Sequence, residues 1–492
     1  MSETNLPILN YSSKGISICK NSITLEEQYK IKNELTVKPF VPPNSLQTRN
    51  SFSIYRESTK KIYVPRFYAI QKFNYSLSPN AYCEHNHIQK YIDNTFQFNG
   101  DLRDYQKAII EAYIRESKKS GCGLLEIPCG RGKTVMALNI ISILKHKTLV
   151  IVHKEFLLNQ WVERIQQFLP NVSIGRIQGK IIQTQNCDIV IGMLQSLSMK
   201  EYNSQLFQQF GLTVVDECHH IGAEVFSRSL FKIVTPYMLG LSATMERKDQ
   251  TSNVFRMFLG NVVYSEKPKT DQDVLVRCVF YENEDEDYAN TEYNFRGQVH
   301  YSRMIKKICE YEYRTVLILR ILEDIKNEVE NRQIMILAHN KSILNILFQE
   351  IGRQNIGSVG YYIGGMKESQ LKESESKSII LATYAMAEEA LDIKTLSALI
   401  LATPKTDVTQ AVGRILRMKH TNPLVVDIVD QHDIFQRQWL KRKSYYKKCN
   451  YTIKQIHSKD YTNQFDLWSE FAKKSKSKSV KNINKGECLI TI

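Results

Sequence analysis

The stretch GLLEIPCGRGKTVMALNII at residues 123–141 decides the fold. It starts with apolar residues typical of a buried strand, passes through a loop containing Gly130 and Gly132, and ends in an apolar helical pattern. Glycines in such a loop let backbone N–H groups curl around phosphate oxygens, and the helix that follows favours negative charge at its N-terminus. The stretch therefore predicts a site for the phosphates of a nucleotide.

Two side chains at the end of this loop carry the expected chemistry. Lys133 supplies a point charge for the β- and γ-phosphates, and Thr134 supplies a hydroxyl for Mg²⁺. Ile127 stands where such loops usually have their first glycine, and the alternative is an ordinary glycine turn before a helix. The order strand, loop, helix favours phosphate binding. The residues predicted to contact the nucleotide here are Pro128, Cys129, Gly130, Arg131, Gly132, Lys133 and Thr134.

A second motif, LTVVDECHH at residues 212–220, places two carboxylates directly after an apolar strand. In α/β sheets, ligands bind at the carboxyl ends of the strands. We expect Asp216 to hold Mg²⁺ through the coordination shell of the ion, and Glu217 to orient and deprotonate the attacking water. His219 is a candidate relay between the nucleotide and neighbouring residues. An Asp-Glu pair alone is weak evidence, but after a phosphate loop in the same lobe it indicates nucleotide hydrolysis.

A third motif, QAVGRILR at residues 410–417, is basic on one side if it is helical. On an α-helix, Gln410, Arg414 and Arg417 fall on one stripe, while apolar neighbours face the core. The alternative is an amphipathic helix with a solvated basic face. Because charge develops on the γ-phosphate oxygens during hydrolysis, cations from outside the phosphate loop are needed, and both arginines fit the role of arginine fingers.

Apolar strands and helical patterns alternate along most of the chain. Near-continuous apolar runs occur at 148–152, 188–191, 212–215 and 237–241, and again at 333–337, 378–382, 398–402 and 424–428. Such strands are buried on both faces, as in a parallel sheet covered by helices. The pattern predicts an α/β protein with two tandem, doubly wound lobes. The acidic run at 282–287 is interpreted as an exposed linker or loop.

These patterns divide the chain into four predicted regions. The first, residues 1–98, is rich in Asn, Ser, Tyr and Pro and is expected to form a small, α/β or mostly β accessory domain. Residues 99–270 form the first, ATP-binding lobe, and residues 271–455 form the second lobe. A basic tail occupies residues 456–492.

The net charge of +15 favours a polyanionic partner. Much of the excess lies in 473–492 and in 437–448, where six basic residues occur without an acid. Trp439, Tyr445 and Tyr446 interleave with the cations of 437–448, which suits phosphate tracking as well as a solvated helix end. The alternative for the Lys/Ser-rich tail is a disordered segment.

The remaining composition bears on location and metals. No apolar run is long enough to span a bilayer, so no membrane partner is expected. The ten cysteines include no Cys-x-x-Cys pair, which favours free thiols in a reducing, cytosol-like compartment. Cys83, His85 and His87 form a short cluster, but no second ligand pair with zinc spacing accompanies it, so a metal site there is disfavoured.

Taken together, these motifs resemble superfamily 2 helicases of the DExH kind, specifically the XPB-like group and its relatives in large DNA viruses. The resemblance covers residues 99 to about 430 in the same order. It identifies Gln106, in LRDYQ at 102–106, as the adenine contact. The segments similar to strand-contacting motifs lie at 152–161 and 192–196, and 364–365 and 383–392 are similar to strand-contacting and coupling segments. By the same resemblance, the residues that couple hydrolysis to lobe movement are His219, Ser242, Ala243 and Thr244. Ala390 stands where a glycine is usual.

The resemblance implies two RecA-like lobes and an ATP-dependent helicase or translocase that uses ATP and Mg²⁺. It implies a nucleic-acid partner, with DNA favoured over RNA, and a role beside transcription-complex proteins. The alternatives are an RNA helicase, a translocase that moves on duplex without separating strands, and an ATP-gated nucleic-acid binding protein. The expected location is the cytoplasm or the virion, with the nucleus as a further alternative.

Overall fold

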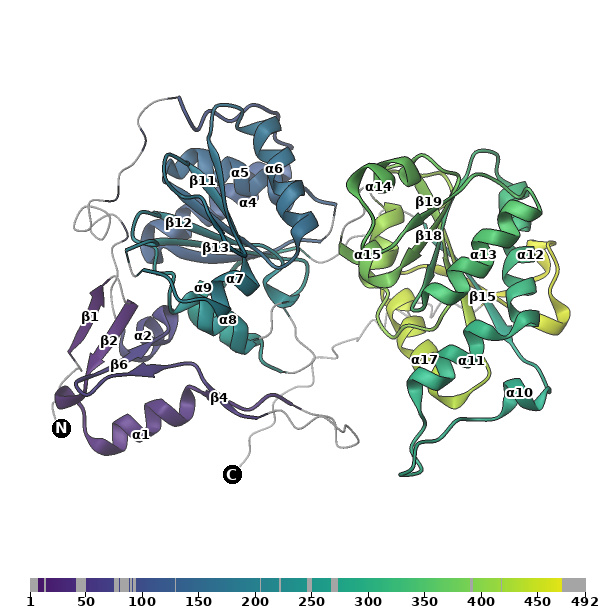
Figure 1. Cartoon of the computed structure of the whole chain (residues 1–492), viewed down its shortest axis with the longest axis horizontal. Helices are drawn as coiled ribbons and strands as arrows, with labels where there is room; N and C mark the ends of the chain where they lie inside the picture. The colour runs from purple at the N-terminus through teal and green to yellow at the C-terminus, as the bar shows by residue number, and fades with distance from the viewer. Residues whose placement is uncertain are drawn as a thin grey trace, which may run out of the picture. The chain divides into compact units, whose positions relative to one another are not determined.

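The computed structural model describes residues 8–12, 15–40, 50–74, 79, 88, 91, 94–128, 130–203, 205–220, 223–245, 250–266, 273–389, 393–416 and 418–470. The chain divides into two compact units, Met1–Pro268 and Lys269–Ile492 (Figure 1). Each unit contains its own eight-stranded sheet.

The first unit is built on a nearly all-parallel sheet. Its strands are β7 (Cys122–Glu126), β8 (Thr148–Val152), β9 (Ile174–Gln178), β10 (Ile181–Ile182), β11 (Ile189–Met193), β12 (Leu212–Val215), β13 (Tyr237–Ser242) and β14 (Val262–Ser265). Their order is β10-β9-β11-β8-β12-β13-β7-β14, and only β9 and β10 pair antiparallel. Every residue of β8, β11, β12 and β13 is buried, as predicted from their apolar runs.

Helices cover both faces of this sheet. They are α4 (Asp104–Ser120), α5 (Lys133–Leu144), α6 (Glu155–Phe168), α7 (Leu194–Met199), α8 (Ala223–Leu230) and α9 (Ser252–Leu259), with a short 3-10 helix η2 (Cys218–His220). Alternate residues of one strand enter different cores: Leu149 and Ile151 belong to one cluster, and Val150 and Val152 to the other. This alternation is the side-chain period of a strand buried on both sides.

The N-terminal region adds a small antiparallel sheet to the same unit. Its elements are β1 (Leu9–Ser12), β2 (Gly15–Cys19), η1 (Lys20–Ser22), α1 (Leu25–Glu34), β3 (Thr36–Val37), β4 (Phe52–Ser53), β5 (Arg56–Glu57), β6 (Lys61–Val64) and α2 (Arg66–Phe73). Its strand order is β1-β2-β6-β5, and β1, β2 and β6 are labelled in purple in Figure 1. Ile18 and Phe67 share one hydrophobic core with Phe255 of α9. The N-terminal sheet therefore packs on the first lobe, and the predicted boundary at residue 98 stays a prediction.

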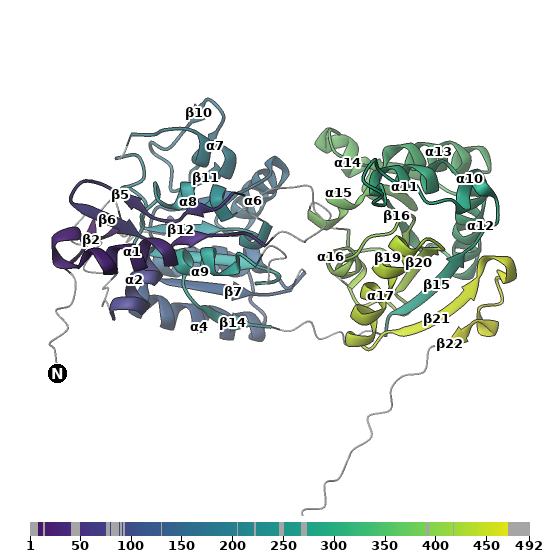
Figure 2. The ribbon, with the colours of Figure 1, turned by 90° about the horizontal axis from the view of Figure 1, so that it is seen from below.

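The second unit repeats the architecture. Its strands are β15 (Leu275–Tyr281), β16 (Gln333–Ala338), β17 (Val359–Tyr362), β18 (Ile379–Thr383), β19 (Leu396–Leu401), β20 (Leu424–Asp430), β21 (Thr452–His457) and β22 (Ser469–Glu470), in the order β17-β18-β16-β19-β20-β15-β21-β22. Its helices are α10 (Glu286–Ala289), α11 (Tyr301–Glu310), α12 (Glu312–Glu328), α13 (Lys341–Arg353), α14 (Glu368–Glu375), α15 (Tyr384–Glu389), α16 (Thr409–Val412), η3 (Gly413–Leu416), α17 (Asp433–Lys448), η4 (Ser458–Asp460) and η5 (Phe465–Leu467). Figure 2 shows the helices α11, α12 and α13 on one side of this sheet. The predicted α/β class with two parallel-sheet lobes is confirmed.

Two parts of the second unit differ from the sequence-based interpretation. The acidic run at 282–287 is mostly exposed and follows β15 as a loop that leads into α10, so the loop alternative is confirmed and the linker between lobes is wrong. β15 escaped prediction because its centre carries Arg277, whose charge is compensated by Glu328 at 2.6 Å. At the other end, β21 continues to His457 and pairs with β22, so ordered structure extends past residue 455.

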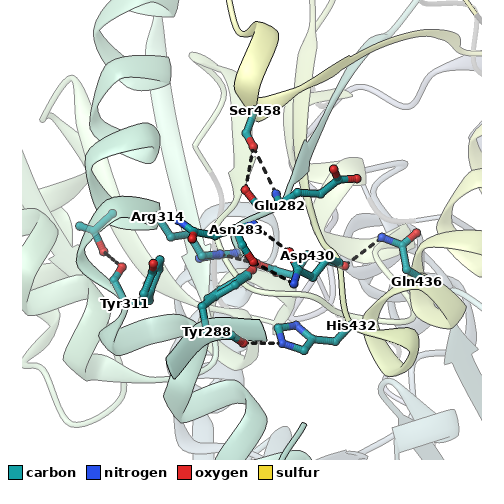
Figure 3. A network of polar contacts seen from close by, with 11 residues as sticks. Glu282, Asn283, Tyr288, Tyr311, Arg314, Asp430, His432, Gln436 and Ser458 are labelled. Carbon is teal, nitrogen blue, oxygen red and sulfur yellow. Dashed lines mark hydrogen bonds and ion pairs between the residues drawn. The ribbon is translucent and has the colours of Figure 1, made fainter. Parts of the chain in front are cut away.

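A buried ion pair joins α12 to the end of β20, and Tyr288 of α10 attaches the β15–α11 connection to it (Figure 3). Arg314 donates from Nε to Asp430 Oδ1 at 2.5 Å and from Nη2 to Oδ2 at 3.0 Å. The Tyr288 hydroxyl donates to the same carboxylate at 2.6 Å, and His432 Nε2 lies 2.8 Å from the Tyr288 carbonyl oxygen. Both charged side chains are fully buried, and burial with a bidentate partner is the geometry that such a pair needs.

The stretch 437–448 is only partly available to a strand. α17 (Asp433–Lys448) contains all of it, and its Trp439, Arg442 and Tyr446 are buried, while phosphate tracking by its exposed cations stays a prediction. Arg442 forms two hydrogen bonds to Asp427, at 2.8 and 2.9 Å, so this cation serves the core. The aromatic residues interleave with cations because the helix is amphipathic. Its exposed basic residues are Arg437, Lys441, Lys447 and Lys448.

Among the described residues, no helix combines the length and apolar character that crossing a bilayer requires.

Candidate active site

Three neighbouring strands of the first sheet bring the chemical motifs together. β12 pairs with β13, and β13 pairs with β7, all in parallel. The glycine loop follows β7, the two carboxylates follow β12, and Ser242 ends β13. Since parallel strands end at the same edge, motifs that lie more than a hundred residues apart in sequence meet there.

The glycine loop has the backbone that a phosphate cradle requires. Gly130 and Gly132 both have a φ of 81°, in the left-handed region. Gly132 is the N-cap of α5, so Lys133 is the first helical residue. A Cβ at Gly132 would lie 2.5 Å from the Gln106 amide nitrogen, so Gln106 would have to shift, and the left-handed φ strains any other residue there. The predicted strand, loop and helix are therefore present; Cys129 lies outside the described residues.

Gln106 braces this loop from the N-terminus of α4. Its Oε1 accepts from the backbone N–H of Arg103 at 3.0 Å, and its Nε2 donates to the Arg131 carbonyl at 3.2 Å. The Tyr105 hydroxyl donates to the same carbonyl at 3.3 Å. The Arg131 guanidinium lies 3.8 Å from the Tyr105 ring centroid and 2.6 Å from Glu266. Gln106 thus positions the loop, and its predicted adenine contact stays a prediction.

Two of the predicted catalytic side chains, Lys133 and Glu217, form an ion pair. Lys133 Nζ lies 2.5 Å from Glu217 Oε1, and these side chains are 10% and 18% exposed. Glu217 Oε2 lies 3.4 Å from His219 Nδ1. Glu217 has a φ of 46°, a conformation uncommon outside glycine that concentrates at functional sites.

Asp216 is held by a tryptophan that the sequence did not single out for this role. Trp161 of α6 donates from Nε1 to Asp216 Oδ2 at 2.8 Å. Burial raises the pKa of Asp216 to about 6, and the neighbouring Glu217 carboxylate adds to this rise, while Lys133 and the Trp161 hydrogen bond oppose it. The sequence-based prediction places Trp161 with segment 152–161 among the strand contacts. The pairing of β8 with β12, which places α6 beside Asp216, is invisible in the sequence.

The Ser-Ala-Thr segment is linked to this cluster through His219. Its Nδ1 lies 2.7 Å from the Ser242 hydroxyl. Ser242 donates to the Thr244 carbonyl at 2.5 Å and accepts from the Thr244 N–H at 3.3 Å. Ala243 lies between them. A continuous polar path therefore runs from Lys133 through Glu217 and His219 to Ser242.

The donors at this edge fit Mg²⁺ held together with phosphates. Thr134 and Asp216 offer oxygen ligands, and Mg²⁺ in nucleotide sites usually takes one or two protein oxygens beside phosphates and waters. Within the part of the chain that the structure describes, no group of three or more His, Cys, Asp or Glu could form a dedicated metal cage. The cluster Cys83, His85 and His87 lies outside that part.

The basic motif of the second unit is shorter as a helix than predicted. α16 ends at Val412, and a 3-10 helix, Gly413–Leu416, follows. Glycine is a poor helix former, so Gly413 is a natural end for the α-helix. The continuous α-helical stripe through 417 is therefore wrong. Arg414 is nearly buried, at 5% exposure, and Arg417 lies outside the described residues.

A polar cluster lies at the carboxyl edge of the second sheet. His339 Nδ1, after β16, lies 2.8 Å from Thr403 Oγ1, after β19. The Tyr384 hydroxyl donates to the Thr403 carbonyl at 2.6 Å. Burial, helped by Lys405, lowers the pKa of His339 to about 4, so this imidazole is neutral at physiological pH. Sequence reasoning missed His339 and Thr403, although a polar residue right after an apolar strand was the available signal.

The predicted strand-contacting segments of the first unit meet each other. Gln195 Nε2 donates to the His153 carbonyl at 3.2 Å, because β11 pairs with β8. In the second unit, Gly365 has a φ of 92°, and Lys341 Nζ lies 3.4 Å from the Gly364 carbonyl oxygen. Ala390 lies outside the described residues.

Comparison with protein families gives one domain match and several relatives. A family model described as Type III restriction enzyme, res subunit, matches residues 99–247. A protein of Acanthamoeba polyphaga mimivirus, provisionally named as an ATP-dependent RNA helicase, is 34% identical over 467 residues, covering 93% of this chain and 88% of the relative. A provisionally named helicase of Invertebrate iridescent virus 6 is 26% identical over 378 residues, covering 73% of this chain and 83% of the relative. The DNA 3'-5' translocase XPB2 of Sulfurisphaera tokodaii is 34% identical over 170 residues, 33% of this chain and 35% of that protein.

Solved structures share the architecture. The structure of S. cerevisiae Dbp5 bound to RNA and ADP BeF3 aligns with a TM-score of 0.51 at 12% identity, over 80% of this chain and 96% of that chain. At this identity the likeness concerns the fold alone, and it confirms that the lobes are RecA-like.

Proposed function

Because the chain belongs to the superfamily 2 helicases, among those related to giant-virus helicases and XPB, and is therefore an ATP-dependent helicase, we propose that it moves along DNA during viral transcription. The observation that carries the motor assignment is the Lys133–Glu217–His219–Ser242 path at one sheet edge. It connects the phosphate loop and the hydrolytic carboxylate to the segment that the family uses for coupling.

The proposed chemistry assigns one task to each side chain. Lys133 binds the β- and γ-phosphates, and Thr134 and Asp216 hold Mg²⁺, which neutralises charge on the phosphate oxygens when bound. Glu217 orients a water and accepts its proton as the water oxygen bonds to the γ-phosphorus. The bond from that phosphorus to the β-bridging oxygen breaks, and its electron pair leaves with ADP. Gln106 contacts adenine.

The second lobe is proposed to complete the reaction. Arg414 and Arg417 supply the positive charge that the γ-phosphate oxygens need as the bond breaks, with Gln410 beside them. His219, Ser242 and Thr244 transmit the change in phosphate contacts to the grip on the strand. Because this grip is mainly on phosphates, sequence preference is slight and affinity falls steeply with salt.

Two substrates have specific support. DNA is favoured by the 34% identity to a DNA 3'-5' translocase over 170 residues. RNA is the second candidate, since the mimivirus relative that covers 93% of this chain carries an RNA helicase name. Transcription-complex proteins are the proposed partners, and the cytoplasm or virion, or alternatively the nucleus, is the proposed location.

Parallel ATPase assays test the proposal. Wild-type protein is assayed with single-stranded DNA, duplex DNA and RNA at equal phosphate concentration, with Glu217→Gln as the control for contaminating ATPases. The proposal predicts the largest stimulation by DNA. Stimulation mainly by RNA would select the second candidate, and stimulation by duplex alone would indicate a translocase without strand separation. Hydrolysis unaffected by any nucleic acid would contradict the motor assignment.

A further inference from the structure

A groove of about 410 Å³ lies in the first unit, lined by residues of β4, β5, α8 and their neighbours and by none of the residues proposed for the ATP site. Its walls include Phe52, Tyr55, Arg56, Glu224, Arg228 and Phe231. The volume falls within the range of about 300 to 1,000 Å³ that is usual for small-ligand sites. The groove combines N-terminal residues with α8 and the turn after it, which belong to one compact unit.

The lining pairs aromatic rings with a cation. Phe52, Tyr55 and Phe231 are each partly exposed, so ring surface is available to a ligand. The Arg56 guanidinium carbon lies 5.2 Å from the Phe231 ring centroid, within cation–π range. Burial lowers the pKa of Arg56, while Glu201 opposes this. A guanidinium stays protonated in proteins, so this side chain carries its charge. A cation is thus held at the edge of an aromatic surface.

The charge balance of the groove is positive. Glu224 is its one acid among the described lining residues, and Arg228 pairs with it at 2.5 Å. The charge of Arg56 is therefore left over within the lining. A ligand that combines a flat ring with a negative group matches this surface, and an unpaired nucleotide in a strand has both.

We propose that this groove binds one unpaired nucleotide of the nucleic-acid strand, with the base against Phe231 and Tyr55 and a phosphate at Arg56. Stacking on aromatic rings tolerates every base, which suits a motor without sequence preference. The inference rests on the proposed function, because it requires a nucleic-acid substrate. The groove would add a nucleic-acid contact outside the ATP site and outside segments 152–161 and 192–196.

Binding of fluorescein-labelled oligo(dT) and oligo(U) by fluorescence anisotropy tests the groove. The variants are Arg56→Ala and Phe231→Leu, and the matched control is Arg115→Ala, an exposed arginine on α4 of the same unit. We expect each groove variant to bind at least about fivefold more weakly, the lower end for losing one stacked base. Arg56→Ala should also make the slope of log affinity against log salt shallower by about 0.7, the value for one phosphate of a single strand. Arg115→Ala should keep wild-type affinity.

Photocrosslinking of the wild-type protein supplies a second measurement, which does not depend on whether the variants fold. A strand containing 5-iodouridine should crosslink to the peptide that carries Tyr55 or Phe231. Wild-type affinity in both groove variants, or crosslinks that avoid both peptides, would overturn the inference and leave the proposed function intact. Wild-type protein that binds no strand would contradict the proposed function itself.

Discussion

The Lys133 ammonium lies 2.5 Å from the Glu217 carboxylate, so the phosphate-loop lysine and the hydrolytic glutamate are direct partners. Both are proposed to act at the γ-phosphate, one as its cation and the other as the base for the attacking water. ATP must therefore compete with Glu217 for Lys133. This competition links nucleotide binding to the position of the base.

Glu217→Gln is predicted to slow hydrolysis while preserving ATP binding. Loss of a general base lowers kcat by about 10² to 10⁴. The neutral amide releases Lys133 from its ion pair, so the Kd for ATP should stay equal or fall. Steady-state turnover and titration with a fluorescent ATP analogue measure the two effects. Lys133→Ala is the contrasting variant, expected to weaken binding as well; near-wild-type turnover by either would contradict the site assignment.

The pH dependence of kcat/KM should show the titration of Asp216. Its pKa of about 6 means that protonation below pH 6 removes the carboxylate proposed to hold Mg²⁺. The value of kcat/KM, which reports on the free enzyme, should therefore fall below about pH 6. Trp161→Phe deletes a hydrogen bond to the charged form, so the pKa rises and the acid limb moves to higher pH. An unmoved limb would show that another group titrates.

The contribution of Asp216 to stability depends on pH in the opposite direction to its contribution to activity. Its folded-state pKa of about 6 exceeds the unfolded value of 3.8, so the unfolded chain gives up this proton first. Between these two values, its contribution to the free energy of unfolding falls as pH rises. Activity that increases over a pH range in which this contribution decreases is the pattern expected of a buried catalytic carboxylate.

The fold was largely predictable because its strands are buried on both faces. Runs such as 148–152 and 212–215 are apolar except for one threonine each, and both form central strands. β15 was missed because Arg277 interrupts its apolar run and is compensated by Glu328, far away in sequence. The burial of Arg442 in 437–448 was missed for the same reason, because this arginine pairs with Asp427 inside the core. A core segment that contains a buried ion pair cannot be recognised from its apolar residues alone.

The site was predictable where motifs are local and unpredictable where topology joins them. The backbone of Gly130 and Gly132 follows from the loop sequence, as does the position of Asp216 and Glu217 after a strand. The contact of Trp161 with Asp216 depends on the pairing of β8 with β12. Strand order leaves no trace in local sequence, so such partners could not be foreseen.

Gly132→Ala is predicted to abolish tight ATP binding. Its left-handed φ of 81° strains any other residue, and the new Cβ would lie 2.5 Å from the Gln106 amide that braces the loop. Gly179→Ala is the matched control, because Gly179 has a φ of 54° but no neighbour within 4 Å of the added Cβ. We expect the Kd for ATP to rise at least about tenfold in the first variant, roughly 1.4 kcal/mol, and to change little in the second. An unchanged Kd for ATP in Gly132→Ala would contradict the assignment of this loop as the phosphate cradle.

Removing one partner of the Arg314–Asp430 pair should lower the free energy of unfolding more than removing both. Arg314→Met leaves the Asp430 carboxylate buried with the Tyr288 hydroxyl as its remaining partner, and should lower the free energy of unfolding by about 3 to 5 kcal/mol. Arg314→Met combined with Asp430→Leu removes both charges and should cost much less. Urea unfolding followed by circular dichroism measures both variants. A double variant less stable than the single one would contradict the account of this pair as a compensated buried charge.

The most direct test of the central claim is ATP-driven displacement of streptavidin from a biotinylated single strand of DNA or RNA. A motor that steps along phosphates should displace streptavidin from one end of the strand, with a rate that depends on ATP, while Glu217→Gln should bind the strand without displacing it. Hydrolysis by the wild-type protein with no displacement from either end of either strand, or equal displacement by Glu217→Gln, would contradict the account.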